Sequence, residues 1–275
     1  MRKEESIIQS KSEKEPTKEK GKDVEIIVSI IRHGEKTSEG KLSQLGLEKT
    51  KKMGEEKEIK NGIKGYASPF SRATETLDGI LKGIKEQSKP QRVFKSRVRF
   101  ELSPPKWNHF KEIISKAKDV EKSEGGAGLF RYMLSEPLVQ EDLEHWTSGL
   151  AYLVNKYIRM ANKLYSHSKV ELLHITHDIV IGDFLRKVAI MKDDKGKRID
   201  FNDIDVFLNV FGEHVKFLEG FNFEIYLDEN REKHLKINFH DKPLEVDEEK
   251  LMDLVDKFQK KPYVGRINKQ DWKKE

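Results

Sequence analysis

The chain has 275 residues, enough to bury one sizeable hydrophobic core, and 37% of them are charged. Lys and Arg number 53 against 48 Asp and Glu, and a net charge of +5 spread among both signs is typical of solvated helix faces, so we expect no nucleic-acid partner. The chain has no cysteine, which excludes disulfides and thiol catalysis. It also has no membrane-length apolar run or signal peptide, so we expect a cytoplasmic protein with no membrane partner.

The two ends of the chain differ in composition from its centre. Residues 1–22 are almost entirely Lys, Glu, Ser and Gln, which cannot bury enough apolar surface to become ordered, and they predict a disordered charged tail. Residues 259–275 are rich in Lys and predict a basic, solvated tail. One folded domain is therefore expected over residues 23–258.

The first predicted element of the domain is a buried strand. Residues 24–31 form an apolar, β-branched run, which is typical of a parallel strand with both faces covered. Arg32, His33, Gly34 and Glu35 follow it directly. Ligands of open α/β sheets bind outside the carboxyl ends of the strands, so these residues predict an anion site, and the arginine points to phosphate.

A second polar motif follows the next predicted strand. Ser68 can cap a helix and Pro69 suits its first position. Apolar residues then recur at a helical period up to Ile84, which places Arg72 in the first turn. The free backbone amides and the dipole of a helix start favour an anion there.

The third polar motif lies much later in the chain. A long core-facing helix is predicted over residues 143–164 and a buried strand over 170–176, which ends at His177 and Asp178 and is followed by a helix from 179 to about 191. His174, on the strand itself, is expected to be a core histidine. Residues 215–218, 221–227 and 235–239 predict late strands with an edge hairpin turning at 228–230, and a helix is expected over 248–258.

These three polar motifs, in this order, resemble those of the histidine phosphatase superfamily, the phosphoglycerate-mutase-like proteins. The resemblance rests on Arg32-His33-Gly34-Glu35, on the run from Ser68 to Thr76, and on His177 after its strand, while residues 42–48 resemble the segment that opens the family's first helix. It spans residues 24 to 258. It implies a three-layer α/β/α sandwich with a mostly parallel sheet, and a variable lid at about 102–137 that would select the substrate.

The residue types themselves fit phosphoryl transfer. Neutral imidazole is a nucleophile near pH 7, and His33 is our candidate for a phosphohistidine intermediate. Arg32 and Arg72 suit bidentate binding of phosphate oxygens. By resemblance, His177 contacts the transferred phosphoryl group. Gly34 and Glu35 are added to the expected phosphate site, with Glu35 either shaping the pocket or orienting Arg32.

The proton donor to the leaving group has two candidates. One branch of the family uses a glutamate after the third strand, where Glu101 stands, and the acid-phosphatase branch uses the aspartate directly after the second histidine, here Asp178. The spacing around Glu101 departs from the leucine, any residue, glutamate pattern of the mutase branch. We favour Asp178 and keep both.

The sequence thus predicts a metal-independent phosphatase with no cofactor, acting on a small phosphorylated substrate or a phosphoprotein. No metal-binding spacing is present in the sequence. Two alternatives stay open. One is a phosphoglycerate-type mutase, although residues 36–40 lack the tryptophan and asparagine that follow the mutases' first motif. The other is a non-catalytic module that binds phosphate or phosphoproteins.

Overall fold

The computed structural model describes residues 19–59, 62–87, 93–103, 110–212, 215–240 and 242–260. The strands are β1 (Val24–Arg32), β2 (Ile63–Ala67), β3 (Val93–Val98), β4 (Lys169–Thr176), β5 (Ala189–Lys192), β6 (Arg198–Asp200), β7 (Gly220–Leu227), β8 (Lys233–Phe239) and β9 (Lys242–Val246). The helices are α1 (Gln44–Glu56), α2 (Ser71–Gln87), the 3₁₀ helix η1 (Phe100–Leu102), α3 (Phe110–Ser135), α4 (Pro137–Ala161), α5 (Asp178–Val188), α6 (Ile204–Phe211) and α7 (Glu248–Lys260).

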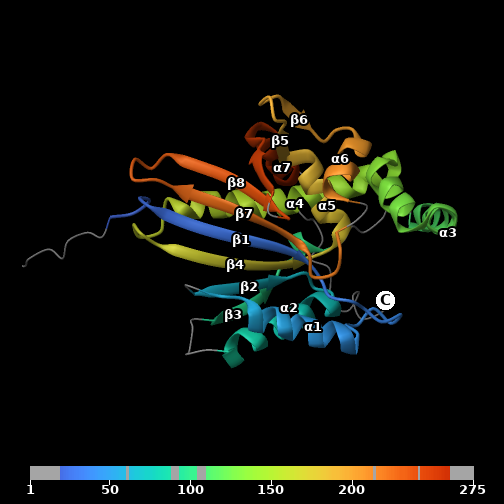
Figure 1. The fold of residues 1–275 in the computed structure, drawn as a ribbon, viewed down its shortest axis with the longest axis horizontal. Coiled ribbons are helices and arrows are strands. Elements are labelled where there is room, and N and C mark those ends of the chain that lie inside the picture. Colours follow the sequence, from blue (N-terminus) through green and yellow to red (C-terminus); the bar gives the residue numbers. More distant parts are fainter. Residues whose placement is uncertain are drawn as a thin grey trace, which may run out of the picture.

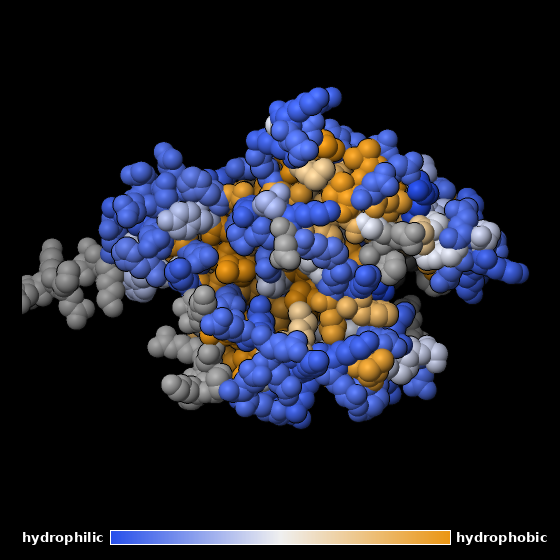
Figure 2. Space-filling view, in the orientation of Figure 1, coloured by the Kyte–Doolittle hydropathy of each residue, from blue (hydrophilic) through white to orange (hydrophobic). Residues whose placement is uncertain are grey.

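The described strands form one nine-stranded sheet in the order β3-β2-β4-β1-β7-β8-β9-β5-β6. Helices cover both of its faces, with α1 and α2 below the sheet in Figure 1 and α4 and α5 on the opposite side. The three-layer arrangement is therefore as expected. Figure 2 shows that hydrophilic side chains cover most of the visible surface of the α1–α2 layer.

The prediction of a mostly parallel sheet is wrong. Only the pairs β1–β4, β2–β4 and β2–β3 are parallel, and the other neighbouring strands of the described chain are antiparallel. The physical reason is connection length: parallel neighbours need long crossovers through helices, whereas β7, β8 and β9 follow one another through short turns. The parallel half of the sheet carries the three predicted polar motifs at its strand ends.

The late hairpin is present but does not lie at an edge. β7 pairs with β1 in the middle of the sheet, and β9, β5 and β6 extend the sheet beyond β8. Residues 215–218 form a turn rather than a strand, and the helix expected to reach residue 191 ends at Val188, where the chain enters β5. Such short elements are set by pairing with β9 and β6, which local patterns do not reveal.

The alternation of side chains along β1 builds the two halves of the core. Val24, Ile26, Val28 and Ile30 face the α4–α5 layer and belong to the larger cluster of buried residues. Ile31 lies in a smaller cluster with residues of α2. Because both faces of β1 are covered, the run of β-branched residues predicted from the sequence is confirmed as a buried strand.

Close packing of α1 against α2 fixes the start of α2 near the sheet. A Cβ atom on Gly54 would lie 2.1 Å from the carbonyl oxygen of Ile80, and one on Gly83 would lie 2.1 Å from that of Lys51. Only glycine permits this approach. Ser43 caps α1, because its Oγ accepts a hydrogen bond from the backbone N–H of Gly46 at 2.9 Å.

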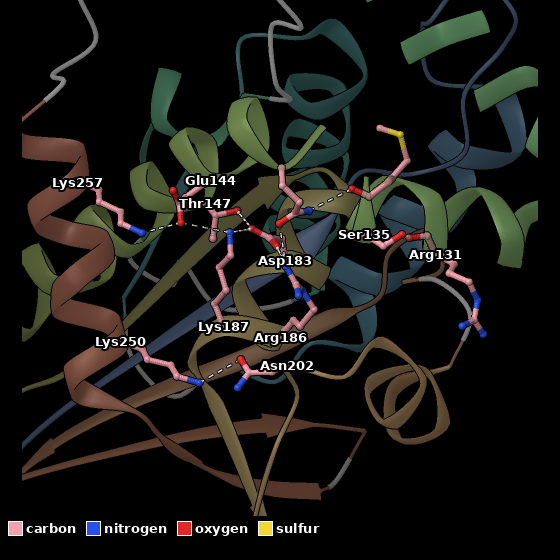
Figure 3. A network of polar contacts seen from close by, with 12 residues as sticks. Arg131, Ser135, Glu144, Thr147, Asp183, Arg186, Lys187, Asn202, Lys250 and Lys257 are labelled. Atoms are coloured by element: carbon pink, nitrogen blue, oxygen red, sulfur yellow. Dashed lines mark hydrogen bonds and ion pairs between the residues drawn. The ribbon is translucent and has the colours of Figure 1, made fainter. Parts of the chain in front are cut away.

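A buried carboxylate joins α4 to α5 (Figure 3). Asp183 is fully buried and accepts hydrogen bonds from Thr147 (2.7 Å) and Arg186 (3.1 Å), and it pairs with Lys187 at 2.8 Å. Glu144 of α4 extends the network, since it accepts a hydrogen bond from Lys257 of α7 at 2.7 Å. These contacts hold the helix that begins directly after His177.

The expected lid contains a long helix. α3 is kinked at Gly125, whose φ is +70°, and its second half is joined to the core through Phe130 and Leu134. Residues 104–109 lie outside the described part of the chain. Most of both predicted tails does too, although residues 19–22 are described, and there the Gly21 N–H donates to the carbonyl of Leu164 (3.0 Å). Within the described part, no helix has the length and apolar character needed to cross a membrane.

Candidate active site

Three strand ends meet at one edge of the parallel half of the sheet. β1 ends at Arg32 and His33, β4 ends at His177 and Asp178, and β2 leads through Ser68 into α2 with Arg72 in its first turn. β4 lies between β1 and β2 in the sheet, so the three polar motifs are neighbours in space. In the sequence, the third of these motifs lies more than a hundred residues after the second.

The His33 ring is held in one orientation. It is 3% exposed, and its Nδ1 lies 2.8 Å from the carbonyl oxygen of Gly34, to which a ring N–H donates. Nε2 then carries the lone pair, and it accepts a hydrogen bond from Nε of Arg72 at 3.0 Å. Burial lowers the pKa of His33 to about 4, with the Arg72 charge adding to that effect. The ring is therefore neutral at pH 7, with Nε2 facing a guanidinium.

His177 lies beside His33 with their ring centroids 5.2 Å apart. Its Nδ1 accepts from the Arg72 guanidinium at 3.4 Å, which leaves Nε2–H to donate to the Oγ of Ser68 at 3.0 Å. Burial, and then the charge that His33 carries when it is protonated and the charge of Arg72, hold the pKa of His177 well below its usual range. An anion placed among these groups would oppose that shift and favour the imidazolium.

Arg32 is fixed from several sides. It donates to the carbonyl oxygen of Val215 at 2.5 Å, pairs with Asp178 at 3.1 Å, and its guanidinium stacks on the ring of Phe217 at 4.2 Å. Asp178 in turn accepts from the N–H of Ile179 at 2.9 Å at the start of α5. Arg32 and Asp178 thus form a partly exposed ion pair beside the two histidines.

The structure brings five of the predicted site residues together: Arg32, His33, Arg72, His177 and Asp178. The other three lie differently. The N–H of Gly34 donates to Thr76 Oγ1 at 2.9 Å, and the Glu35 carboxylate is 3.9 Å from Lys49 of α1.

Glu101 lies in η1, next to Leu102, whose carbonyl accepts a hydrogen bond from Thr176 at 2.7 Å. Its carboxylate has no hydrogen bond or ion pair with any described residue. The backbone of Glu101 packs against α4, because a Cβ atom on Gly149 would lie 3.2 Å from the Glu101 carbonyl oxygen.

Several residues at this site were not predicted. Ser68 was expected only as a cap, and its Oγ does accept from the Phe70 N–H (3.3 Å), but it also contacts His177. Lys36 belongs to the same group of charges, because burial and then the charge of Arg72 lower its pKa. The position of Lys36, four residues after Arg32 in the sequence, could have indicated that it belongs to the site. Phe217 comes from a turn more than 180 residues downstream, and no local signal points to it.

His174 is confirmed as a core histidine. It is fully buried, hydrogen-bonded to the hydroxyl of Tyr157 at 2.8 Å and stacked on Tyr66 at 5.0 Å. Burial lowers its pKa to about 3, so it is neutral and does not join the site.

No protein-family model and no curated protein matches this sequence. Solved structures do match. A structure described as mycobacterial hydrolase 2 is 11% identical over 84% of this chain and 97% of its own, with a TM-score of 0.51. A mycobacterial glucosyl-3-phosphoglycerate phosphatase is 12% identical over 77% of this chain and 96% of its own, with a TM-score of 0.46. The α-ribazole phosphatase of Shigella flexneri is 12% identical over 77% and 95%, with a TM-score of 0.41.

At such identities the likeness concerns the fold. The match to mycobacterial hydrolase 2 shows a fold that this chain shares with that protein.

Proposed function

We propose that this protein is a metal-independent phosphatase that hydrolyses a phosphomonoester through a phosphohistidine on His33. The observation that carries the proposal is the state of the His33 ring. Its Nδ1 is held by the carbonyl of Gly34, and its Nε2 faces the Arg72 guanidinium, so a neutral nucleophile and a phosphate-binding cation already lie side by side.

In the first half of the reaction, Arg32 and Arg72 bind non-bridging oxygens of the phosphate. His33 Nε2 attacks phosphorus, the bond from phosphorus to the leaving oxygen breaks, and Asp178 supplies the proton that the alkoxide needs. His177, once protonated by the approach of the anion, donates to an equatorial oxygen where charge accumulates. Arg72 must turn its Nε–H from His33 to the phosphate before the attack.

In the second half, water attacks the phosphohistidine, with Asp178 accepting a proton from the water. The bond from phosphorus to Nε2 breaks and inorganic phosphate leaves. Asp178 suits both steps because it lies at the edge of the site, about one-third exposed, and pairs with the same arginine that would bind the phosphate. When Arg32 turns to the phosphate, the Asp178 carboxyl group is released from its ion pair and is free to face the leaving group.

The test is hydrolysis of p-nitrophenyl phosphate in the presence of a chelator, by the wild type and by His33→Ala. We expect turnover by the wild type and a loss of at least about 1,000-fold in the variant, because no other group replaces the nucleophile. Circular dichroism checks that the variant is folded. Equal rates in the two proteins would exclude His33 as the nucleophile.

A trapping experiment addresses the two alternatives. Rapid acid-free quenching with labelled phosphomonoester should leave label on the wild type and none on His33→Ala. A non-catalytic binding module would take up no label. A mutase would return the label to an acceptor alcohol such as a phosphoglycerate instead of releasing it to water, and product analysis distinguishes these outcomes.

A further inference from the structure

A second cavity lies apart from the paired histidines. Its volume is about 390 Å³, and it lies between α4 and the β2–β3 edge of the sheet. Tyr66 of β2 and Arg99, directly after β3, form one wall. Side chains from the last three turns of α4 and from Lys163 just beyond it form the other. Pockets of a few hundred Å³ hold small organic ligands.

The cavity is lined by cations without acidic partners. Arg99, Lys156, Arg159 and Lys163 all line it, and none of them forms an ion pair with a described residue. The Nε of Arg99 is buried and has no hydrogen-bond partner in the described chain. Lysines elsewhere on the surface are often neutralised, as Lys51 is by Glu86 at 2.7 Å. A concave surface with four unpaired cations favours an anionic ligand.

Aromatic rings stand between these cations. The guanidinium of Arg99 lies 5.3 Å from the centre of the Tyr66 ring, and the ammonium of Lys156 lies 6.0 Å from that of Tyr152. The Tyr152 ring lies 5.0 Å from that of Phe258 and is partly exposed, so its exposed part offers an aromatic surface to a planar ligand. Asn155, on the same wall, offers both a donor and an acceptor to the edge of such a ring.

The cavity is separate from the candidate active site. Most of its lining residues belong to α4, on the side of the sheet where His174 is buried, and none of them has a described contact with His33, His177 or Arg72. The two sites also differ in how the charges act. Arg99 lowers the pKa of His174, whereas Arg72 and Arg32 act on His33.

We propose that this cavity binds a mononucleotide, with its base on Tyr152 and its phosphate among Arg99, Lys156 and Arg159. A nucleotide combines the two chemistries that the walls offer, an aromatic ring for stacking and a phosphate for the cations. Inorganic phosphate would use only the cations, and an uncharged aromatic compound would use only the rings. The proposal does not depend on the phosphatase activity.

The experiment measures binding of adenosine 5′-thiomonophosphate, an AMP analogue that resists phosphatases, by calorimetry on the full chain. The variants are Lys156→Ala/Arg159→Ala at the cavity and Arg72→Ala at the histidines. Lys118→Ala/Lys122→Ala on α3 is the matched control, because it removes the same number of exposed charges elsewhere. Arg72→Ala disables the phosphomonoester site proposed at the histidines, so the binding that it retains belongs to the cavity. We expect Arg72→Ala and the α3 control to keep the cavity binding event, and the cavity variant to bind there at least about tenfold more weakly.

Each other outcome overturns the proposal. Loss of binding in Arg72→Ala alone would place the nucleotide at the histidines. Equal affinity for ribose 5-phosphate or inorganic phosphate would show an anion site with no preference for a base, and so would unchanged nucleotide binding in Tyr152→Leu. Much tighter binding of a short oligoadenylate would show that the cavity takes a nucleic-acid strand rather than a mononucleotide.

Discussion

At the scale of single residues, the arrangement of Arg72 matters most. One guanidinium reaches both histidines, through Nε to His33 and through a terminal nitrogen to His177. Arg72 itself is partly buried, and this burial lowers its pKa, although arginine stays charged at any working pH. Lysine could not make both contacts, since it presents a point charge rather than a planar fork. The site therefore depends on the geometry of this side chain as well as on its charge.

The choice between Asp178 and Glu101 as proton donor also belongs to this scale. We expect Asp178→Asn to lower kcat about 100-fold or more for phenyl phosphate and much less for p-nitrophenyl phosphate, because a good leaving group needs no proton. Loss of the contact with Arg32 would affect both substrates alike, so the leaving-group dependence isolates the acid. Steady-state kinetics with the two esters measures it.

Glu101→Gln is the matched control for that prediction. Its carboxylate has no described contact with either histidine, and we expect both rates to stay within a few-fold of the wild type. A leaving-group-dependent loss in Glu101→Gln, with none in Asp178→Asn, would reverse the assignment.

At the scale of elements, the position of His177 depends on α5. His177 precedes the first residue of α5, so any shift of this helix moves the histidine and Asp178 together. The helix is held by its apolar face against the sheet and by the buried Asp183, which binds to α4 (Figure 3). A fully buried carboxylate with several partners is costly to leave incomplete.

We expect Asp183→Ala to lower the free energy of unfolding by about 3–5 kcal/mol, because it removes the acceptor of Thr147 and leaves Arg186 and Lys187 without their buried partner. Urea denaturation followed by circular dichroism measures this. Glu144→Gln breaks a half-exposed part of the same network. It should lower the free energy of unfolding by no more than about 1 kcal/mol. An equal decrease in the free energy of unfolding for the two variants would mean that Asp183 contributes little to stability through this network.

At the scale of the whole molecule, the fold keeps several histidines buried and neutral. His33, His174 and His177 all have pKa values below the usual histidine range, mainly because of burial. In the unfolded chain their pKa values return to about 6.5. Between that pH and about 4, the unfolded state binds more protons than the folded state, so stability is present above pH 6.5 and is lost on acidification.

We expect the free energy of unfolding to fall between about pH 6.5 and pH 5, by up to about 1.4 kcal/mol per pH unit for each of these histidines. Urea denaturation at a series of pH values measures the slope. His174→Gln should reduce the slope by the share of one histidine without touching the candidate active site. A slope that His174→Gln does not alter would contradict the assignment of His174 as buried and neutral.

Much of the parallel half of the fold could be predicted from the sequence. The run before Arg32, the helical period after Ser68 and the strand before His177 are local patterns, and each ends at a polar residue that marks a strand end or helix start. The antiparallel half was predicted less well. β5 and β6 are short and lack a strong period, and their strand conformation depends on pairing of β5 with β9 and of β6 with β5.

The sequence by itself determined which groups this protein has for phosphate chemistry, because His33, Arg72 and His177 follow from motif, cap and strand end. Only the tertiary structure decided which of the predicted residues meet. Side-chain direction turned Glu35 toward Lys49, and long-range closure placed Phe217 on Arg32. The cavity beside α4 likewise depends on packing between elements far apart in the chain, where no local pattern acts. Local patterns follow from backbone periodicity, whereas these contacts follow from how the layers pack.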